Sequence, residues 1–111
     1  MIYTFMYNVY LISTDDGCKI GFTKRKVEDR IKEFKTGNSN DFKIISVFKS
    51  EYGTKIEKIL HNKYKTKKIK GEWFLLEKED IDNFINECKK SHEILKILND
   101  ENTYIKRKQI P

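Results

Sequence analysis

The chain has 111 residues, 38% of them hydrophobic, which suits one domain with a modest core and excludes two. Its formal net charge is +6, and no apolar run approaches the roughly 18 residues of a transmembrane helix, so we expect no membrane partner. The two cysteines, Cys18 and Cys88, belong to no CxxC cluster. This argues against zinc and favours reduced thiols in an intracellular, cytoplasmic protein.

The charge is unevenly distributed along the chain. Residues 19–70 hold sixteen Lys and Arg against six Asp and Glu, whereas residues 71–101 hold four against nine. This asymmetry predicts a basic surface suited to a polyanion. The alternative is a lysine-rich chain whose lysines only solvate the surface.

The first predicted unit is a hairpin. Residues 7–13 are rich in Tyr, Val and Ile, residues 14–17 read as a turn, and residues 18–22 form a second strand. A four-residue loop would place Tyr10 opposite Gly21 and Ile12 opposite Lys19, so that Tyr10 and Lys19 share a face. Gly21 would then leave open space beside Tyr10, where a phosphate could approach.

A helix follows, for which Thr23 is the candidate cap. Val27, Ile31 and Phe34 recur at helical spacing, and Arg30 lies at the edge of the apolar face that they form. Residues 37–40 end this helix, and residues 42–49 form the third and clearest strand.

The second half of the chain is mostly helical. A helix over residues 54–66 places Glu57 and His61 on one flank, four residues apart. A basic connector (65–70), a short apolar strand (71–76) and a last helix (78–98) follow, and that helix turns Ile94 and Leu98 inward. We therefore predict a single α+β domain over residues 1–98, with residues 99–111 as a basic, frayed tail.

This order of elements resembles the GIY-YIG nuclease superfamily, and most of all its short branch of phage open reading frames and the meiotically up-regulated gene 113 family. The resemblance covers roughly residues 7–86. It rests on Val9-Tyr10-Leu11-Ile12, Lys19-Ile20-Gly21-Phe22-Thr23, Arg30-Ile31-Lys32-Glu33-Phe34, Ile56-Glu57-Lys58-Ile59-Leu60-His61 and Gly71-Glu72-Trp73-Phe74.

The resemblance implies a three-stranded antiparallel sheet, here with a short extra strand, flanked by helices and carrying a phosphodiester-cleaving site. By position, Tyr10 matches the tyrosine of the first motif, Arg30 the arginine that steadies the phosphate, and Glu57 the carboxylate that binds a divalent metal. The first motif reads Asn8-Val9-Tyr10, and Lys19 stands where most of the superfamily has a second tyrosine. The identity of the general base is therefore open.

The residue types suit phosphodiester hydrolysis, which needs charge stabilisation and an activated water. We expect Lys19, Arg30 and a metal to lower the pKa of Tyr10, favouring it as base or water-positioner, with Lys19 as phosphate ligand. Lys19 as base is the alternative. His61 is a candidate to protonate the leaving group or to orient Glu57. Each of these residues also has a purely structural explanation. Tyr10 would pack on the sheet, Glu57 would be an exposed helical carboxylate, and His61 would be a surface residue. Arg30 would pair with Glu33 or Glu57.

Eight basic residues are candidates for a sequence-independent backbone track: Lys24, Arg25, Lys26, Lys63, Lys65, Lys67, Lys68 and Lys70. The favoured function is a Mg²⁺- or Mn²⁺-dependent endonuclease acting on nucleic acid, with DNA preferred, of phage or viral origin. The alternatives are a catalytically weak or inactive nucleic-acid-binding module and a phage accessory protein-interaction domain. The sequence leaves the oligomeric state open.

Overall fold

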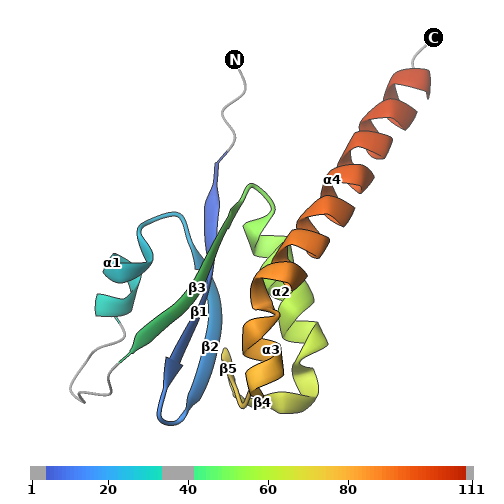
Figure 1. Cartoon of the computed structure of the whole chain (residues 1–111). Helices are drawn as coiled ribbons and strands as arrows, with labels where there is room; N and C mark the ends of the chain where they lie inside the picture. Colours follow the sequence, from blue (N-terminus) through green and yellow to red (C-terminus); the bar gives the residue numbers. More distant parts are fainter. Residues whose placement is uncertain (1–4, 34–41, 110–111) are drawn as a thin grey trace.

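The computed structural model describes the backbone of residues 5–33 and 42–109 and the side chains as far as residue 100 (Figure 1). The chain begins with strands, ends with helices and mixes both between them. In order they are β1 (Tyr7–Thr14), β2 (Gly17–Thr23), α1 (Val27–Lys32), β3 (Lys43–Ser50), α2 (Gly53–Lys63), the 3₁₀ turn η1 (Lys65–Lys67), β4 (Lys68–Lys70), β5 (Trp73–Phe74), α3 (Lys78–Asp82) and α4 (Phe84–Gln109).

The sheet has five antiparallel strands in the order β3-β1-β2-β5-β4. It therefore has one strand more than the predicted three strands and one short extra strand. The additional strand is β4, which lies inside the predicted basic connector and pairs with the two-residue β5. The predicted register of the first hairpin is confirmed, with Tyr10 opposite Gly21 and Ile12 opposite Lys19.

Helices cover both faces of the sheet, as predicted (Figure 1). Val9 and Leu11 of β1 pack in a core with α2 and α4, whereas Tyr10 and Ile12 pack with Val27 and the rest of the apolar face of α1. Because successive strand residues point to opposite faces, all four β1 residues are at most 1% exposed. The full burial of such a side chain contributes about 1.5–3 kcal/mol.

Helix α1 is shorter than predicted and begins at Val27. Thr23 does not cap it, because Thr23 is the last residue of β2 and its hydroxyl accepts a hydrogen bond from the Arg25 N–H at 3.1 Å. The predicted inward residue Phe34 and the predicted helix end at residues 37–40 lie outside the described residues.

The last predicted helix is two helices. Helix α3 ends at Asp82, and α4 begins at Phe84 and continues to Gln109, so the predicted end at residue 98 was wrong. The division into a domain and a tail stays a prediction. Ile94 and Leu98 are about half exposed rather than turned inward, because this part of α4 leaves the body of the molecule (Figure 1). Within the described residues, no helix combines the length and apolar content that crossing a membrane requires.

Candidate functional site

The candidate site lies along the edge of β2 that faces away from β1, and side chains from both faces of the sheet reach this edge. Strand β5 pairs only with Cys18 and Lys19, so it leaves the edge after Lys19 without a strand. Two other groups bind this edge at Ile20. The Ile20 N–H donates to the carbonyl of Glu72 at 3.2 Å, and the Ile20 carbonyl lies 2.9 Å from His61 Nε2. Because a carbonyl only accepts, Nε2 is the donor in this contact.

Tyr10 reaches this strand from β1. A Cβ atom built on Gly21 would lie 2.4 Å from the Tyr10 hydroxyl oxygen and 2.6 Å from its Cζ atom. The expected open space beside Gly21 is therefore absent, because the ring of Tyr10 fills it. Glycine at position 21 is what allows the phenol to lie across β2.

The environment of Tyr10 favours its protonated form. Burial, assisted by the negative charge of Glu72, raises the pKa of Tyr10 to about 12, although the charge and hydrogen bond of Arg30 act in the opposite direction. In the chain alone, desolvation of the nearly inaccessible phenol exceeds the effect of Arg30, so the pKa is raised; the expected lowering by Lys19, Arg30 and a metal together stays a prediction. At neutral pH the structure thus presents a neutral phenol, which can donate a hydrogen bond.

Arg30 approaches the phenol from α1. Its guanidinium is hydrogen-bonded to the Tyr10 hydroxyl and pairs with Glu33, which also pairs with Arg25. Of the two carboxylates named beforehand as partners of Arg30, Glu33 is the one that pairs. The side chain of Arg30 is 34% exposed, so it remains within reach of a ligand at the edge.

Lys19 faces the same side of the sheet as Tyr10, as predicted. Its ammonium lies 3.3 Å from a carboxylate oxygen of Glu72 and 5.8 Å from the centroid of the Trp73 ring. Sequence reasoning missed Glu72 as a member of the site, although its negative charge acts on both Tyr10 and Glu57. The available signal was its position in the Gly71-Glu72-Trp73-Phe74 motif on which the resemblance partly rests.

Glu57 and His61 reach the edge from α2, on the other side of the sheet. They share a flank as predicted, with Glu57 Oε1 3.6 Å from His61 Nε2. Glu57 is buried rather than exposed, and burial raises its pKa, with His61 opposing this and Glu72 adding to it. The ring of Phe74 packs perpendicular to His61 at 4.8 Å and limits its movement.

A divalent metal at this site would have few protein ligands. Within the described residues, no three side chains of His, Cys, Asp or Glu lie close enough to bind one ion. Glu57 is nevertheless a buried carboxylate whose raised pKa shows that its negative charge is poorly compensated. Such a group fits Mg²⁺, which binds through one or two carboxylates and takes its other ligands from water and substrate phosphate.

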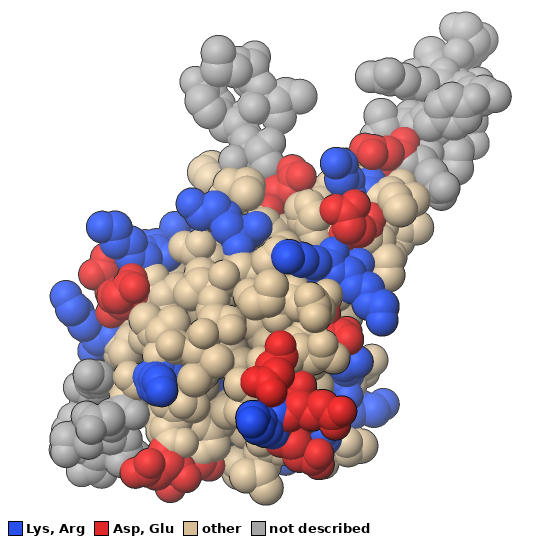
Figure 2. Space-filling view, viewed as in Figure 1, with Lys and Arg blue, Asp and Glu red and all other residues tan. Residues whose placement is uncertain are grey.

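The eight basic candidates fall into two sets. Four are engaged with neighbouring side chains: Lys24 lies over the rings of Phe5 and Tyr7 at 4.5 and 5.5 Å, Arg25 pairs with Glu33, Lys63 with Glu87 at 3.4 Å, and Lys67 with Asp80 at 2.5 Å. The pair made by Lys67 joins the basic segment to α3, over which acidic side chains gather in Figure 2. The others are exposed and form no ion pair within the described part of the chain: Lys26, Lys65, Lys68 and Lys70.

These basic residues flank the site from both ends of β2. Lys24, Arg25 and Lys26 follow its last residue, whereas β4 lies beside its beginning through β5. A strand of seven residues spans about 20 Å. The basic segments therefore lie at the two ends of the site.

Comparison with known proteins supports one family. A family model described as the T5orf172 domain matches residues 2–89, and this span contains every residue of the site. The domain is related to the GIY-YIG/homing-endonuclease-like fold. No curated protein and no solved structure matches the chain.

Proposed function

The chain belongs to the T5orf172 domain family, and on this premise we propose that it is a metal-dependent endonuclease that hydrolyses phosphodiester bonds in DNA. The observation that carries the proposal is the convergence of Tyr10, Lys19, Arg30 and Glu57, from four different elements, on the open edge of β2. We also propose, from the motifs of the sequence, that the chain falls in the short branch of phage open reading frames and the meiotically up-regulated gene 113 family.

Arg30 and Lys19 are the proposed phosphate ligands. A guanidinium binds phosphate bidentately and stays charged at every relevant pH. Both cations are held by carboxylates of the chain, Arg30 by Glu33 and Lys19 by Glu72. A substrate phosphate takes the place of these carboxylates, and the positive charge then stabilises the negative charge that develops in the transition state.

Glu57 is the proposed ligand of Mg²⁺ or Mn²⁺. When bound, such an ion polarises a phosphoryl oxygen and lowers the pKa of a coordinated water. The residues of the chain orient this carboxylate: His61 lies beside Glu57 and is held in turn by the Ile20 carbonyl and the ring of Phe74. This support keeps the carboxylate directed along the edge.

Tyr10 is the proposed water-positioning group. Because its pKa is about 12, the phenol stays protonated, and it acts through Arg30, whose guanidinium it holds by a hydrogen bond beside the position of the water and the phosphate. The proton of the water then passes to a base other than Tyr10, and Lys19 is the alternative that the sequence offers.

A second function is favoured by the same ion pairs. With Lys19 and Arg30 neutralised by Glu72 and Glu33, and with Tyr10 protonated, the site resembles a polar binding surface that lacks a base. A nucleic-acid-binding module without cleavage would keep the exposed lysines of β4 and bind in a salt-sensitive manner.

Incubation of the purified protein with supercoiled plasmid in Mg²⁺, Mn²⁺ or EDTA tests the proposal. We expect nicked circles that require metal. Salt-sensitive retardation of the plasmid without nicking in either metal would instead establish the binding module. A purification in which nicking does not follow the protein peak would identify a contaminant, so activity is measured across the final column.

A further inference from the structure

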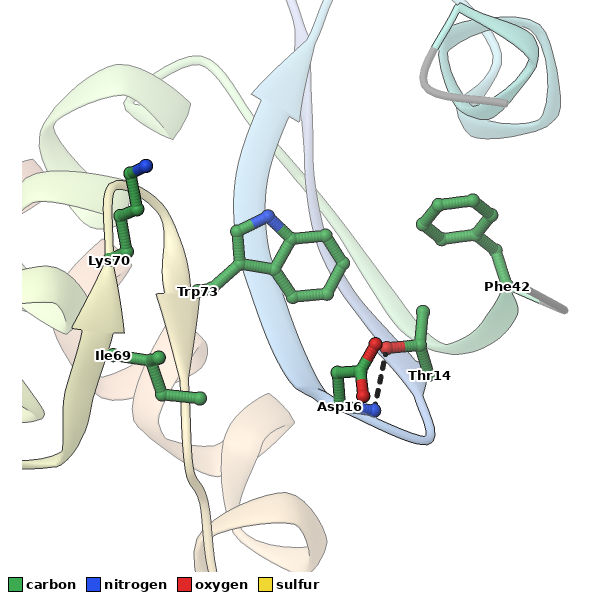
Figure 3. A pocket seen from close by; sticks show the side chains of 6 residues that line it. All are labelled: Thr14, Asp16, Phe42, Ile69, Lys70 and Trp73. Atoms are coloured by element: carbon green, nitrogen blue, oxygen red, sulfur yellow. Dashed lines mark hydrogen bonds between the residues drawn. The ribbon is translucent and has the colours of Figure 1, made fainter. Parts of the chain in front are cut away.

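A second concave site lies next to the edge of β2, and none of the roles proposed above uses it. It is a pocket of about 270 Å³ between the β4–β5 hairpin and the turn that joins β1 to β2. In Figure 3 the indole of Trp73 stands at its centre, with Ile69 and Lys70 on one side and the remaining lining residues on the other. Those residues are Thr14, Asp16 and Phe42.

The aromatic side chains of this pocket are suited to stacking. The rings of Trp73 and Phe42 have centroids 6.2 Å apart and are tilted by 40°, so they do not cover one another face to face. Both side chains remain partly exposed and line the pocket. Flat aromatic ligands stack on such rings, and a nucleobase is the flat ligand that a nucleic-acid-binding surface meets.

The charges connect this pocket to the phosphate site. Lys19 lies 5.8 Å from the centroid of Trp73, and it shares a face of the sheet with Tyr10, two residues before the Gly21 that Tyr10 covers. Lys70 lines the pocket from the opposite side. A strand whose phosphate contacts Lys19 would therefore bring its neighbouring base to the indole.

The polar lining and the volume restrict the occupant. The carboxylate of Asp16 can accept hydrogen bonds from the amino groups of cytosine or adenine, and the turn that carries it is ordered by the Asp16 N–H, which donates to Thr14 Oγ1 at 3.1 Å (Figure 3). A pocket of about 270 Å³ is small for a drug-sized ligand and has room for one base rather than a base pair.

We propose that this pocket, which we name the Trp73 pocket, binds a single unpaired nucleobase stacked on the indole. The proposal rests on the nucleic-acid function proposed above and refines it, since a base enters the pocket only from a single-stranded, frayed or locally opened segment. The preferred substrate is thus nucleic acid with unpaired bases near the site of cleavage, rather than uninterrupted duplex.

The chain offers a direct probe, because Trp73 is its one tryptophan. Intrinsic fluorescence is followed while the protein binds a 12-nucleotide strand of mixed sequence, the duplex of the same sequence, and a strand of equal length without bases. Anisotropy of an end label reports binding in the same samples. We expect strong quenching by the single strand, weak quenching by the duplex and none by the abasic strand. Binding of the single strand without quenching would refute the pocket.

A matched pair of variants separates stacking from packing. Trp73→Phe keeps an aromatic face, and Trp73→Leu keeps apolar bulk without one. We expect Trp73→Leu to weaken binding of the single strand about tenfold, as the loss of one stacked base does, and Trp73→Phe to change it less than threefold. Neither variant should alter the affinity for the abasic strand. Equal losses for both strands would mean that Trp73 acts only through the fold and would overturn the assignment.

The outcomes also separate this pocket from the nuclease proposal. Quenching by the single strand without plasmid nicking leaves the pocket in place and refutes the nuclease. Nicking with bound strand but no quenching does the reverse. If the single strand does not bind at low salt, the pocket proposal fails, and the plasmid assay alone decides the nuclease proposal. If Trp73→Leu does not fold, as judged by circular dichroism, the comparison of the single and abasic strands on the unaltered protein still decides.

Discussion

The packing of Tyr10 against Gly21 makes a prediction that does not depend on function. In Gly21→Ala, the new Cβ atom would stand 2.4 Å from the Tyr10 hydroxyl and 2.6 Å from Cζ, distances at which atoms must move. The ring is only 1% exposed and its neighbours are packed, so it cannot move without disturbing the α1 side of the core. Overpacking of this kind costs about 1–3 kcal/mol of unfolding free energy.

The same substitution would be favourable if the ring were absent. Alanine in a strand interior is about 0.5–1 kcal/mol better than glycine, because the unfolded chain loses conformational freedom. Tyr10→Leu removes the two atoms that the Cβ would meet and keeps an apolar side chain. We therefore expect Gly21→Ala to destabilise the unaltered protein by about 1–2 kcal/mol and to be neutral or slightly stabilising in the Tyr10→Leu background, a coupling of about 2 kcal/mol.

Urea unfolding of the four proteins in this double-mutant cycle measures the coupling. With a slope of about 1–3 kcal/mol per molar urea, the expected effect moves the midpoint by roughly 1 M. Gly17→Ala is an unsuitable control, because Gly17 has a φ of +148°. Gly71 has open space around it, so Gly71→Ala is the control in which only backbone strain acts. Effects at positions 10 and 21 that add within 0.5 kcal/mol would show that the ring does not lie across β2.

Three further predictions concern charge and burial. Burial raises the pKa of Glu57 in the folded chain, so stability falls as pH rises from the ordinary pKa of about 4.3 through the raised pKa. Glu57→Gln should therefore be more stable than the unaltered protein at pH 7 and equal to it below pH 4. Urea titrations at both pH values measure this difference. Burial raises the pKa of Cys18 and brings that of Cys88 to about 12, so neither thiol should react with a disulfide reagent at pH 8 until urea unfolds the chain; rapid native reaction would contradict the buried placement. Neutralising the exposed basic side chains of the β4 region, Lys65, Lys68 and Lys70, should reduce the slope of log affinity for duplex DNA against log salt by about 2–3. Neutralising Lys89 and Lys90 instead should leave the slope unchanged.

The first hairpin shows what sequence can predict. The turn at residues 14–17 and the strand pattern on either side determine the register, and the register places Tyr10, Lys19 and Gly21 on one face. Helical spacing likewise places Glu57 beside His61. Each of these relations is local, because it follows from the side-chain periodicity of a strand or a helix.

The β4–β5 hairpin and α4 show where local pattern is insufficient. Lys68, Ile69 and Lys70 read as a basic connector, and only their pairing with the two residues of β5 makes them a strand. Membership of Glu72 in the site depends on that pairing too, because β5 brings it beside Lys19. The polar end of the chain gave no apolar pattern from which the continuation of α4 could be predicted.

The pKa of Tyr10 is the clearest case of tertiary context overriding residue type. The sequence identified Arg30 as a neighbouring cation, and from a cation alone a lowered pKa follows. Burial of the phenol by Gly21 and α1 is a property of the folded chain, and it outweighs the effect of Arg30. We therefore propose that Tyr10 acts as a protonated hydrogen-bonding group rather than as a base.

The central claim is that the groups at the edge of β2 form one phosphodiester-cleaving site. It is tested most directly by single-turnover cleavage of an end-labelled DNA bound by excess protein, comparing the unaltered protein with Glu57→Gln and with Glu28→Gln, an exposed carboxylate of α1. We predict that all three bind the DNA equally and that only Glu57→Gln leaves it uncut in Mg²⁺. Cleavage by Glu57→Gln at the rate of the unaltered protein would remove Glu57, and with it the proposed site, from the reaction.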